Sequence, residues 1–237
     1  MIRVLLEPGS GTTGQRGSLS DGESHHLRVR RAEVGEMVEV RDGAGLVGHG
    51  RLVRMGGIWG VDLTAAERVG GPAELALAVG AGDRDRFAWV VEKATEFGVT
   101  SVLPLESERT GGVASRVRVR HLERLRRHAR EAVKQSGAAW ATRVEEPVTL
   151  DELLARPLIG HGWVADCSGA AVPAVIGQTP LIVVIGPEGG LTPHELGLLR
   201  DAGYAAVSLG PHTLRFETAA IAAAAAAVAG RLRGNNG

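Results

Sequence analysis

The chain has 237 residues, 44% of them hydrophobic, and 27 basic residues balance 27 acidic ones, so its formal charge is zero. This length allows one large domain or two smaller ones. No apolar run approaches the roughly 20 residues of a membrane-spanning helix, and the first residues lack the apolar core of a signal peptide. The single cysteine, Cys167, excludes an internal disulfide and a cysteine-based zinc site. We therefore expect a cytoplasmic protein without a metal or a membrane segment.

The pattern of residues 1–70 predicts short strands joined by tight turns. The expected strands are Ile2–Leu6, Met37–Arg41, Leu46–Val53 and Ile58–Leu63. The dipeptides Asp42-Gly43 and Gly56-Gly57 are typical of hairpin turns. A helical turn is expected at Asp21–Leu27, with Ser20 or Asp21 as its N-cap. The pattern predicts a small β-barrel domain.

A glycine motif near the N-terminus imitates a dinucleotide-binding loop. Gly9 to Gly14 satisfies G-x-G-x-x-G and follows a strand. A dinucleotide site also needs a helix to begin there, and Gln15 to Ser18 is no helix start. We expect a flexible loop instead.

Beyond a linker at Val69–Ala73, strands and helices alternate, which predicts a second domain, residues 71–237, with a mostly parallel α/β sheet. The expected strands are Leu75–Val79, Ser101–Pro104, Gly162–Asp166, Leu181–Ile185 and Ala205–Leu209. The expected helices are Arg84–Phe97, Val119–Gln135, Leu150–Leu154, Pro193–Ala202 and Arg215–Arg231.

Two segments are basic although the whole chain is neutral. Arg109 to Arg143 contains ten lysines and arginines against two acids, an asymmetry that indicates an anionic partner such as RNA. His26, with Arg28, Arg30 and Arg31, forms a second cluster that could contact RNA phosphates. The alternative for both is a solvated helix face.

The loop Ile185 to Gly190 follows a buried strand and precedes a helix capped by Thr192, with Glu195 at the third helical position. Its three glycines allow a ligand to approach the backbone closely. No G-K-[ST] follows, so it is not a phosphate-binding P-loop. A nucleoside with a sulfonium or amino-acid tail fits better than a triphosphate, and a tight structural turn is the alternative.

A second loop, Leu209 to Ala219, leads into an alanine-rich helix. Thr213 is the expected N-cap, and Arg215 and Glu217 are expected in the first turn. An arginine there opposes the helix dipole, which suggests a binding role. Because both loops follow strands, we expect them side by side at one edge of the sheet.

These motifs resemble the RsmE family of small-subunit ribosomal RNA uridine-N3 methyltransferases, in the SPOUT superfamily. The resemblance is carried by IGPEGGLTPHEL, LGPHTLRFETA, HHLRVRR, VVEKATEFGV, SERTGG and REAVKQSG. It implies a PUA-like N-terminal barrel, a SPOUT α/β domain with a trefoil knot, bound S-adenosylmethionine, a homodimer, and methylation of N3 of one uridine in 16S rRNA. The alternatives are another RNA target, such as tRNA, or a noncatalytic assembly factor.

The resemblance and the loops together give the expected site. The expected cofactor-binding residues are Ile185, Gly186, Pro187, Glu188, Gly189, Gly190, Leu209, Gly210, Pro211, Thr213, Leu214 and Arg215. The expected catalytic residues are Arg215, Glu217 and Glu188, with His212 as a weaker base. The expected RNA-binding residues are His26, Arg28, Arg30, Arg31, Arg109 and Arg126, with Arg109 reaching RNA from a neighbouring subunit.

The chain departs from the family pattern in two places. Asp83-Arg84 stands where relatives often have Lys-Gly, and Lys134 to Ala138 replaces a Glu-Gln followed by arginine. We expect these departures to affect individual RNA contacts and not the cofactor site.

Overall fold

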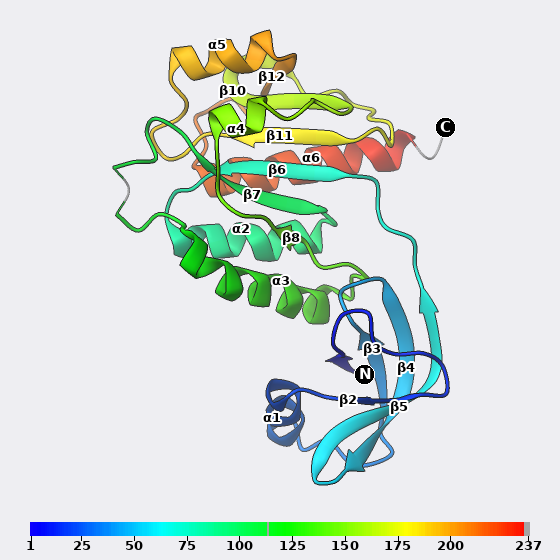
Figure 1. Cartoon of the computed structure of the whole chain (residues 1–237). Coiled ribbons are helices and arrows are strands. Elements are labelled where there is room, and N and C mark those ends of the chain that lie inside the picture. Colours follow the sequence, from blue (N-terminus) through cyan, green and yellow to red (C-terminus); the bar gives the residue numbers. More distant parts are fainter. Residues whose placement is uncertain (113, 235–237) are drawn as a thin grey trace. The chain divides into compact units, whose positions relative to one another are not determined.

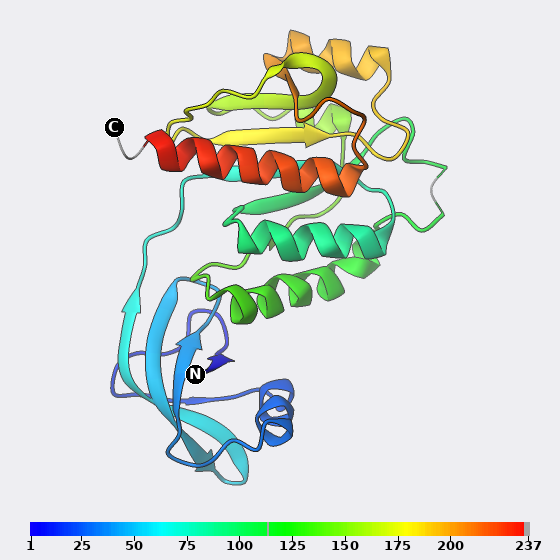
Figure 2. The ribbon, with the colours of Figure 1, turned by 180° about the vertical axis from the view of Figure 1, so that it is seen from behind.

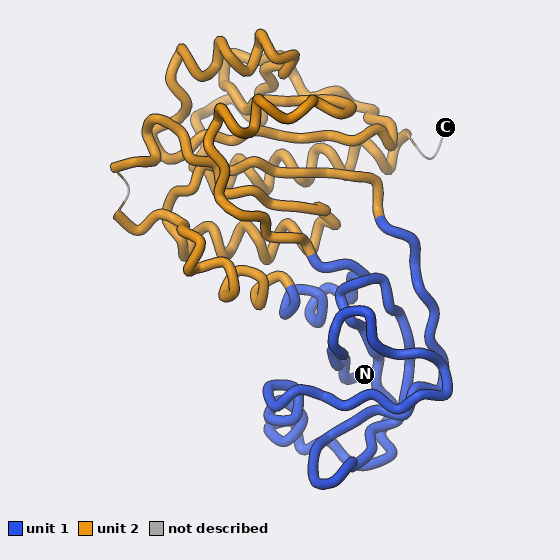
Figure 3. Tube along the Cα trace, in the orientation of Figure 1, with its two compact units in different colours: residues 1–71, 130–141 blue, residues 72–129, 142–237 orange. Residues whose placement is uncertain are grey.

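The computed structural model describes residues 1–112 and 114–234 and consists of two compact units. Unit 1 contains Met1–Gly71 and Arg130–Ala141, and unit 2 contains Pro72–Ala129 and Thr142–Gly237 (Figure 3). Within the described ranges, no helix combines the length and the apolarity that crossing a membrane requires.

Unit 1 is built on a five-stranded sheet in the order β1-β3-β4-β5-β2 (Figure 1). Its elements are β1 (Ile2–Leu5), β2 (Arg16–Ser18), α1 (Asp21–Val29), β3 (Met37–Arg41), β4 (Leu46–Met55) and β5 (Ile58–Arg68). The expected strands are confirmed, and one further strand, β2, was not predicted; it lies just after the loop expected at Gly9 to Gly14. Arg16 to Ser18 pairs with Gly60 to Asp62, so backbone pairing orders a stretch that has no apolar periodicity.

Two local predictions in unit 1, a hairpin turn and a helix N-cap, are confirmed. Gly56 and Gly57 have φ of +58° and +92° and join β4 to β5 directly, as a two-residue hairpin turn requires. Ser20 is the N-cap of α1, and its hydroxyl accepts a hydrogen bond from the Glu23 amide at 3.3 Å.

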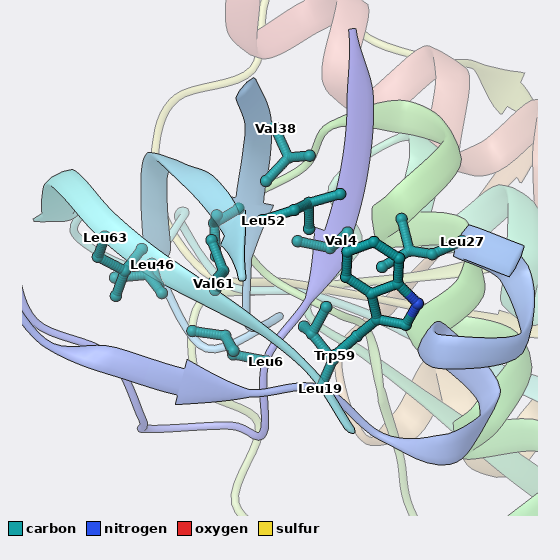
Figure 4. Close-up of a cluster of buried hydrophobic side chains, with 11 residues drawn as sticks. Val4, Leu6, Leu19, Leu27, Val38, Leu46, Leu52, Trp59, Val61 and Leu63 are labelled. Atoms are coloured by element: carbon teal, nitrogen blue, oxygen red, sulfur yellow. The ribbon is translucent and has the colours of Figure 1, made fainter. Parts of the chain in front are cut away.

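The core of unit 1 fills the space between the sheet and α1. Figure 4 shows Trp59 beside Leu27 of α1 and Leu19, with Val4, Leu52 and Val61 further along the sheet. Trp59 is 3% exposed, and the Arg54 guanidinium lies 3.9 Å from the centroid of its ring. Apolar burial of this kind contributes most of the free energy of folding.

The Asp42 carboxylate accepts hydrogen bonds from separate turns of unit 1. Asp42 is 1% exposed, and its carboxylate accepts from the amides of Gly9, Ala44 and Leu46 at 2.7 to 3.0 Å. The Arg68 guanidinium adds an ion pair at 3.2 Å. Four donors therefore satisfy one buried charge, as burial requires.

The C-terminal end of a long helix also packs into unit 1, which the sequence did not predict. The helix is α3 (Leu122–Ser136), and its residues from Arg130 onward belong to this unit. Lys134 forms an ion pair with the buried Glu23 at 2.6 Å, and Arg130 forms one with Glu7 at 3.1 Å.

Unit 2 is an α/β unit whose strand pairs are all parallel. Its sheet runs in the order β12-β10-β11-β6-β7-β8, and β9 also pairs with β7. Besides the start of α3, its elements are β6 (Leu75–Gly80), α2 (Arg84–Glu96), β7 (Ser101–Glu106), a 3-10 turn η1 (Val119–His121), β8 (Arg143–Val144), β9 (Val148–Thr149), α4 (Leu150–Leu154), β10 (His161–Ala171), β11 (Leu181–Ile185), α5 (Pro193–Asp201), β12 (Tyr204–Ser208) and α6 (Phe216–Gly234).

The helices of unit 2 cover both faces of its sheet. On one face α6 packs along β6 and β11 and beside α2 (Figure 2). The alanines of α6 supply this contact, because Ala220, Ala223, Ala224 and Ala227 are buried and small side chains let the helix approach the sheet closely. On the other face, Leu153 of α4 and Leu199 of α5 belong to one apolar cluster.

The structure of unit 2 adds to the expectations and corrects one of them. The short strands β8 and β9 were not predicted; they have two residues each, too few for a periodic signal. The last helix begins at Phe216, so Thr213 is not its N-cap and Arg215 precedes its first turn. Strand β10 lies between β11 and β12, yet the two glycine loops still meet at one edge of the sheet, as expected, because residues of both line one cavity.

We predict that Asp42→Ala strongly destabilises unit 1. The substitution leaves buried amides without acceptors, which should cost about 3 kcal/mol or more. Urea denaturation followed by circular dichroism measures this loss. Asp62→Ala is the matched control, because Asp62 pairs with Arg16 on the surface and such pairs contribute little. Equal effects of the two substitutions would contradict the role of Asp42.

Candidate active site

A cavity of about 230 Å³ lies at the carboxyl ends of β11 and β12 and beside the middle of β10. The carboxyl ends of parallel strands are the usual ligand site of such sheets. The lining residues are Ala165, Asp166, Cys167, Ile185, Gly186, Pro187, Glu188, Gly190, Leu191, Leu196, Leu209, Gly210, His212, Thr213, Leu214, Phe216 and Ala219. All the expected cofactor-binding residues are among them except Gly189, Pro211 and Arg215.

The first loop is a tight turn closed on itself. The Gly190 amide donates to the Pro187 carbonyl at 2.8 Å, and Gly190 has a φ of +70°, which favours glycine. A Cβ on Gly186 would lie 2.9 Å from the Leu191 amide nitrogen. The predicted capping box of Thr192 and Glu195 follows, and it fixes where α5 begins.

Glu195 also joins this loop to the loop after β7. It is 2% exposed, and its carboxylate accepts from the Thr192 amide at 2.7 Å and the Glu108 amide at 2.9 Å. The neighbouring Arg109 donates a hydrogen bond to the Gly189 carbonyl. Arg109, expected to contact RNA, therefore lies against the glycine loop of its own chain.

The loop between β6 and α2 packs against the other side of the glycine loop. A Cβ on Gly80 would lie 2.3 Å from the Pro187 nitrogen, and one on Gly82 would lie 2.5 Å from Glu188 Oε2. Glu188 Oε1 accepts from the Asp83 amide at 3.0 Å. Only glycines permit this approach, which holds the Glu188 carboxylate at the cavity wall.

Asp166 and Cys167 line the cavity but were not predicted as site residues. They lie where β10 bulges, with a register shift against β12 between Ala165 and Ala170. The Ser168 amide and hydroxyl donate to Asp166 Oδ1 at 2.8 and 2.9 Å and hold the pKa of that carboxyl below its usual value. Their position at the carboxyl end of a predicted strand was the signal that could have identified them.

The second loop separates the remaining candidates. Leu209, Gly210, Thr213 and Leu214 line the cavity, and Thr213 Oγ1 lies 3.8 Å from Cys167 Sγ. Arg215 instead lines an adjoining cavity with Arg86, Glu188, Thr213 and Leu214. The two cavities share Glu188, Thr213 and Leu214.

Glu217 lies in the first turn of α6 and is buried, at 7% exposure. Its Oε1 accepts from Arg86 at 3.0 Å. Glu217 lines neither cavity, whereas Glu188 lines both. The structure thus distinguishes two carboxylates that the sequence left equivalent.

The expected RNA-binding residues lie in both units. In unit 1, Arg28, Arg30 and Arg31 are exposed at the end of α1. His26 is partly buried, and burial, followed by the charge of Lys134, lowers its pKa. In unit 2, Arg126 Nε donates to the Val144 carbonyl at 3.1 Å.

The two departures from the family pattern have local roles. Asp83 is the N-cap of α2, and its carboxylate accepts from the amides of Arg86 and Asp85. The Arg86 amide, the larger cause, and the Ser115 hydroxyl lower the pKa of Asp83. Lys134 neutralises the buried Glu23, as described above.

Comparisons with known proteins agree with this architecture. A family model described as an RNA methyltransferase domain matches residues 70–228. A ribosomal RNA small subunit methyltransferase E from Synechocystis is 30% identical over 212 residues, covering 85% of this chain and 69% of the relative. One from Mycobacterium tuberculosis is 30% identical over 225 residues, covering 86% and 82%.

A solved structure is similar over nearly its whole length. The ribosomal RNA small subunit methyltransferase E from Neisseria gonorrhoeae, bound to S-adenosyl methionine, has a TM-score of 0.84 and 27% identity and covers 95% of this chain and 96% of its own. This chain therefore belongs to the family of RNA methyltransferases that includes the ribosomal RNA small subunit methyltransferases E.

Proposed function

We propose that the protein transfers a methyl group from S-adenosylmethionine to N3 of a uridine in 16S rRNA. The observation that carries the proposal is the cavity at the ends of β11 and β12 and the middle of β10, in a chain that belongs to an RNA methyltransferase family. Its relatives are named for the small-subunit ribosomal RNA. The ribosome and its RNA substrate put the proposed reaction in the cytoplasm.

The charge of the cavity fits a cationic methyl donor. Two carboxylates, Asp166 and Glu188, line it, and its described lining contains no lysine or arginine. The glycine loop brings backbone groups to the wall without side chains in the way. When bound, S-adenosylmethionine supplies a methyl group on a positively charged sulfur, which a nucleophilic nitrogen can attack. Acidic and apolar walls suit that charge, whereas a triphosphate would be repelled.

Among the predicted catalytic residues, we propose that Glu188 accepts the proton that leaves N3 of uracil. N3 of uracil carries a proton that must leave as the nitrogen attacks, and a general base can accept it. Glu188 lies on the wall shared by the two cavities and is anchored by the Asp83 amide. Arg215, which lines the adjoining cavity, holds the negative charge that develops on the base.

We also propose the finer architecture that the resemblance to the RsmE family implies. Unit 1 is a PUA-like RNA-binding domain, supported by its five-stranded sheet and the exposed arginines after α1. Unit 2 contains a trefoil knot: the chain passes from β11 beyond β10 to β12, and α6 then returns to contact β6 and β11. The active form is a homodimer.

Mass spectrometry of ribosomal RNA nucleosides tests the function directly. After incubation of small ribosomal subunits with S-adenosylmethionine carrying a labelled methyl group, we expect label in 3-methyluridine from 16S rRNA. Label in tRNA without label in 16S rRNA would contradict the proposal. The absence of label in any RNA would favour a noncatalytic assembly factor.

Glu188→Gln should lower turnover by about 10²- to 10⁴-fold, the usual contribution of a general base. Glutamine keeps the shape of the side chain and an oxygen for the Asp83 amide, so the fold should be retained. The rate of methyl transfer at saturating cofactor, measured on samples quenched at successive times, gives the effect. Unchanged turnover would remove Glu188 from proton transfer.

Gly82→Ala should reproduce much of the Glu188→Gln defect. The added Cβ would lie within 2.7 Å of both Glu188 carboxylate oxygens, and the flexible side chain must move away. Turnover should fall while the thermal unfolding midpoint changes little. Gly197→Ala is the control, because a Cβ there meets nothing within 4 Å and alanine favours the helix. Full activity of Gly82→Ala would contradict the requirement for an anchored carboxylate.

A further inference from the structure

The cavity beside the cofactor cavity contains one charged residue, Arg86, to which no role has yet been given. It has a volume of about 320 Å³ and is lined by Arg86, Glu188, Thr213, Leu214 and Arg215. It shares Glu188, Thr213 and Leu214 with the cofactor cavity. A molecule in one cavity would therefore touch the same side chains as a molecule in the other, as transfer of a group between them requires.

Arg86 is held in this cavity by a buried carboxylate. Its guanidinium lies 3.0 Å from Glu217 Oε1, and the Arg86 side chain is 43% exposed, whereas the Glu217 side chain is only 10% exposed. Glu217 Oε2 is buried without a hydrogen-bond partner among the described residues. The first turn of α6 favours the negative charge of Glu217. The ion pair orients one side of the Arg86 guanidinium toward Glu217 and leaves its other N–H groups able to donate to a ligand.

Two cations and one carboxylate thus face the same space. Arginine offers only donors, and an ionised carboxylate offers only acceptors. The cavity therefore presents donors at Arg86 and Arg215 and an acceptor at Glu188. The edge of uracil has the complementary pattern, since O2 and O4 accept hydrogen bonds on either side of the N3–H donor. Cytosine does not, because it carries an amino group at C4 and no proton on N3.

We propose that this cavity binds the acceptor uracil and that Arg86 donates to one of its carbonyl oxygens, with Glu217 as a positioning residue that holds Arg86. The inference rests on the proposed function. When N3 loses its proton, negative charge spreads onto the carbonyl oxygens, and a fixed guanidinium stabilises it. Arg86 therefore contributes to rate as well as to the choice of uracil over cytosine. Glu217 is too deeply buried to take the proton itself.

The test compares Arg86→Ala with the unmodified protein on small ribosomal subunits. Losing a charged hydrogen bond should lower kcat/KM for formation of 3-methyluridine by about 10- to 100-fold. The affinity for S-adenosylmethionine, measured by calorimetry, should not change, because Arg86 does not line the cofactor cavity. Lys93→Ala is the control: it removes another ion-paired cation of α2, bound to Glu92 and Glu96, and should retain full activity.

The pH dependence distinguishes a direct role from a structural one. If Arg86 stabilises the deprotonated base, its loss should move the rise of kcat with pH to higher pH, and Arg86→Lys should restore part of the shift. Should Arg86→Ala fold poorly because Glu217 is left buried and unpaired, the double variant Arg86→Ala/Glu217→Gln removes that charge. Glu217→Gln should add no further loss to Arg86→Ala, because Glu217 acts through Arg86.

The outcomes separate this inference from the proposed function. If the unmodified protein makes 3-methyluridine but Arg86→Ala keeps its kcat/KM and pH profile, the inference is overturned and the function stands. An equal loss of cofactor affinity in Arg86→Ala would also overturn it. If the unmodified protein makes no 3-methyluridine, the proposed function fails and the inference fails with it.

Discussion

The site depends on the close backbone contact between the β6–α2 loop and the glycine loop after β11. Gly80 lies so near Pro187 that any side chain would collide with backbone, and Gly82 leaves room for the Glu188 carboxylate to reach the Asp83 amide. The contact is possible because β6 and β11 are neighbouring parallel strands, so their carboxyl ends meet at one edge. The loop is thereby fixed before any ligand binds, and preorganised groups of this kind are the main source of electrostatic catalysis.

Buried carboxylates fix further loops and side chains within each unit. Glu195 joins the glycine loop to the loop after β7, Glu217 holds Arg86, and in unit 1 Asp42 gathers amides from separate turns. Each carboxylate accepts several hydrogen bonds or pairs with a cation, as a buried charge must. Asp166 and Glu188 instead line the cavity at the strand ends, where we propose that Glu188 accepts the proton.

Much of this could be predicted from the sequence, for physical reasons specific to each element. Strands such as Met37–Arg41 and Leu181–Ile185 were predicted with correct bounds because turn residues flank their apolar runs, and the capping box of α5 marks its own start. The sequence did not predict in this way which strands lie next to one another or which distant side chains are in contact. The position of β10 between β11 and β12, the pair of Arg86 with Glu217 and the approach of Gly82 to Glu188 join residues far apart in the chain. Periodicity carries no information about such contacts. Thr213 was mistaken for a cap because the loop runs two residues further than its composition suggests.

A crystal structure with S-adenosylhomocysteine tests the central claim most directly, namely that the cavity formed by the ends of β11 and β12 and the middle of β10 is the methyl donor site. The account predicts that the product occupies this cavity, with backbone of Gly186 to Gly190 and of Leu209 to Leu214 against it and its sulfur on the side of Glu188. Density for the product in unit 1 or along α3, with the cavity unchanged, would contradict the account.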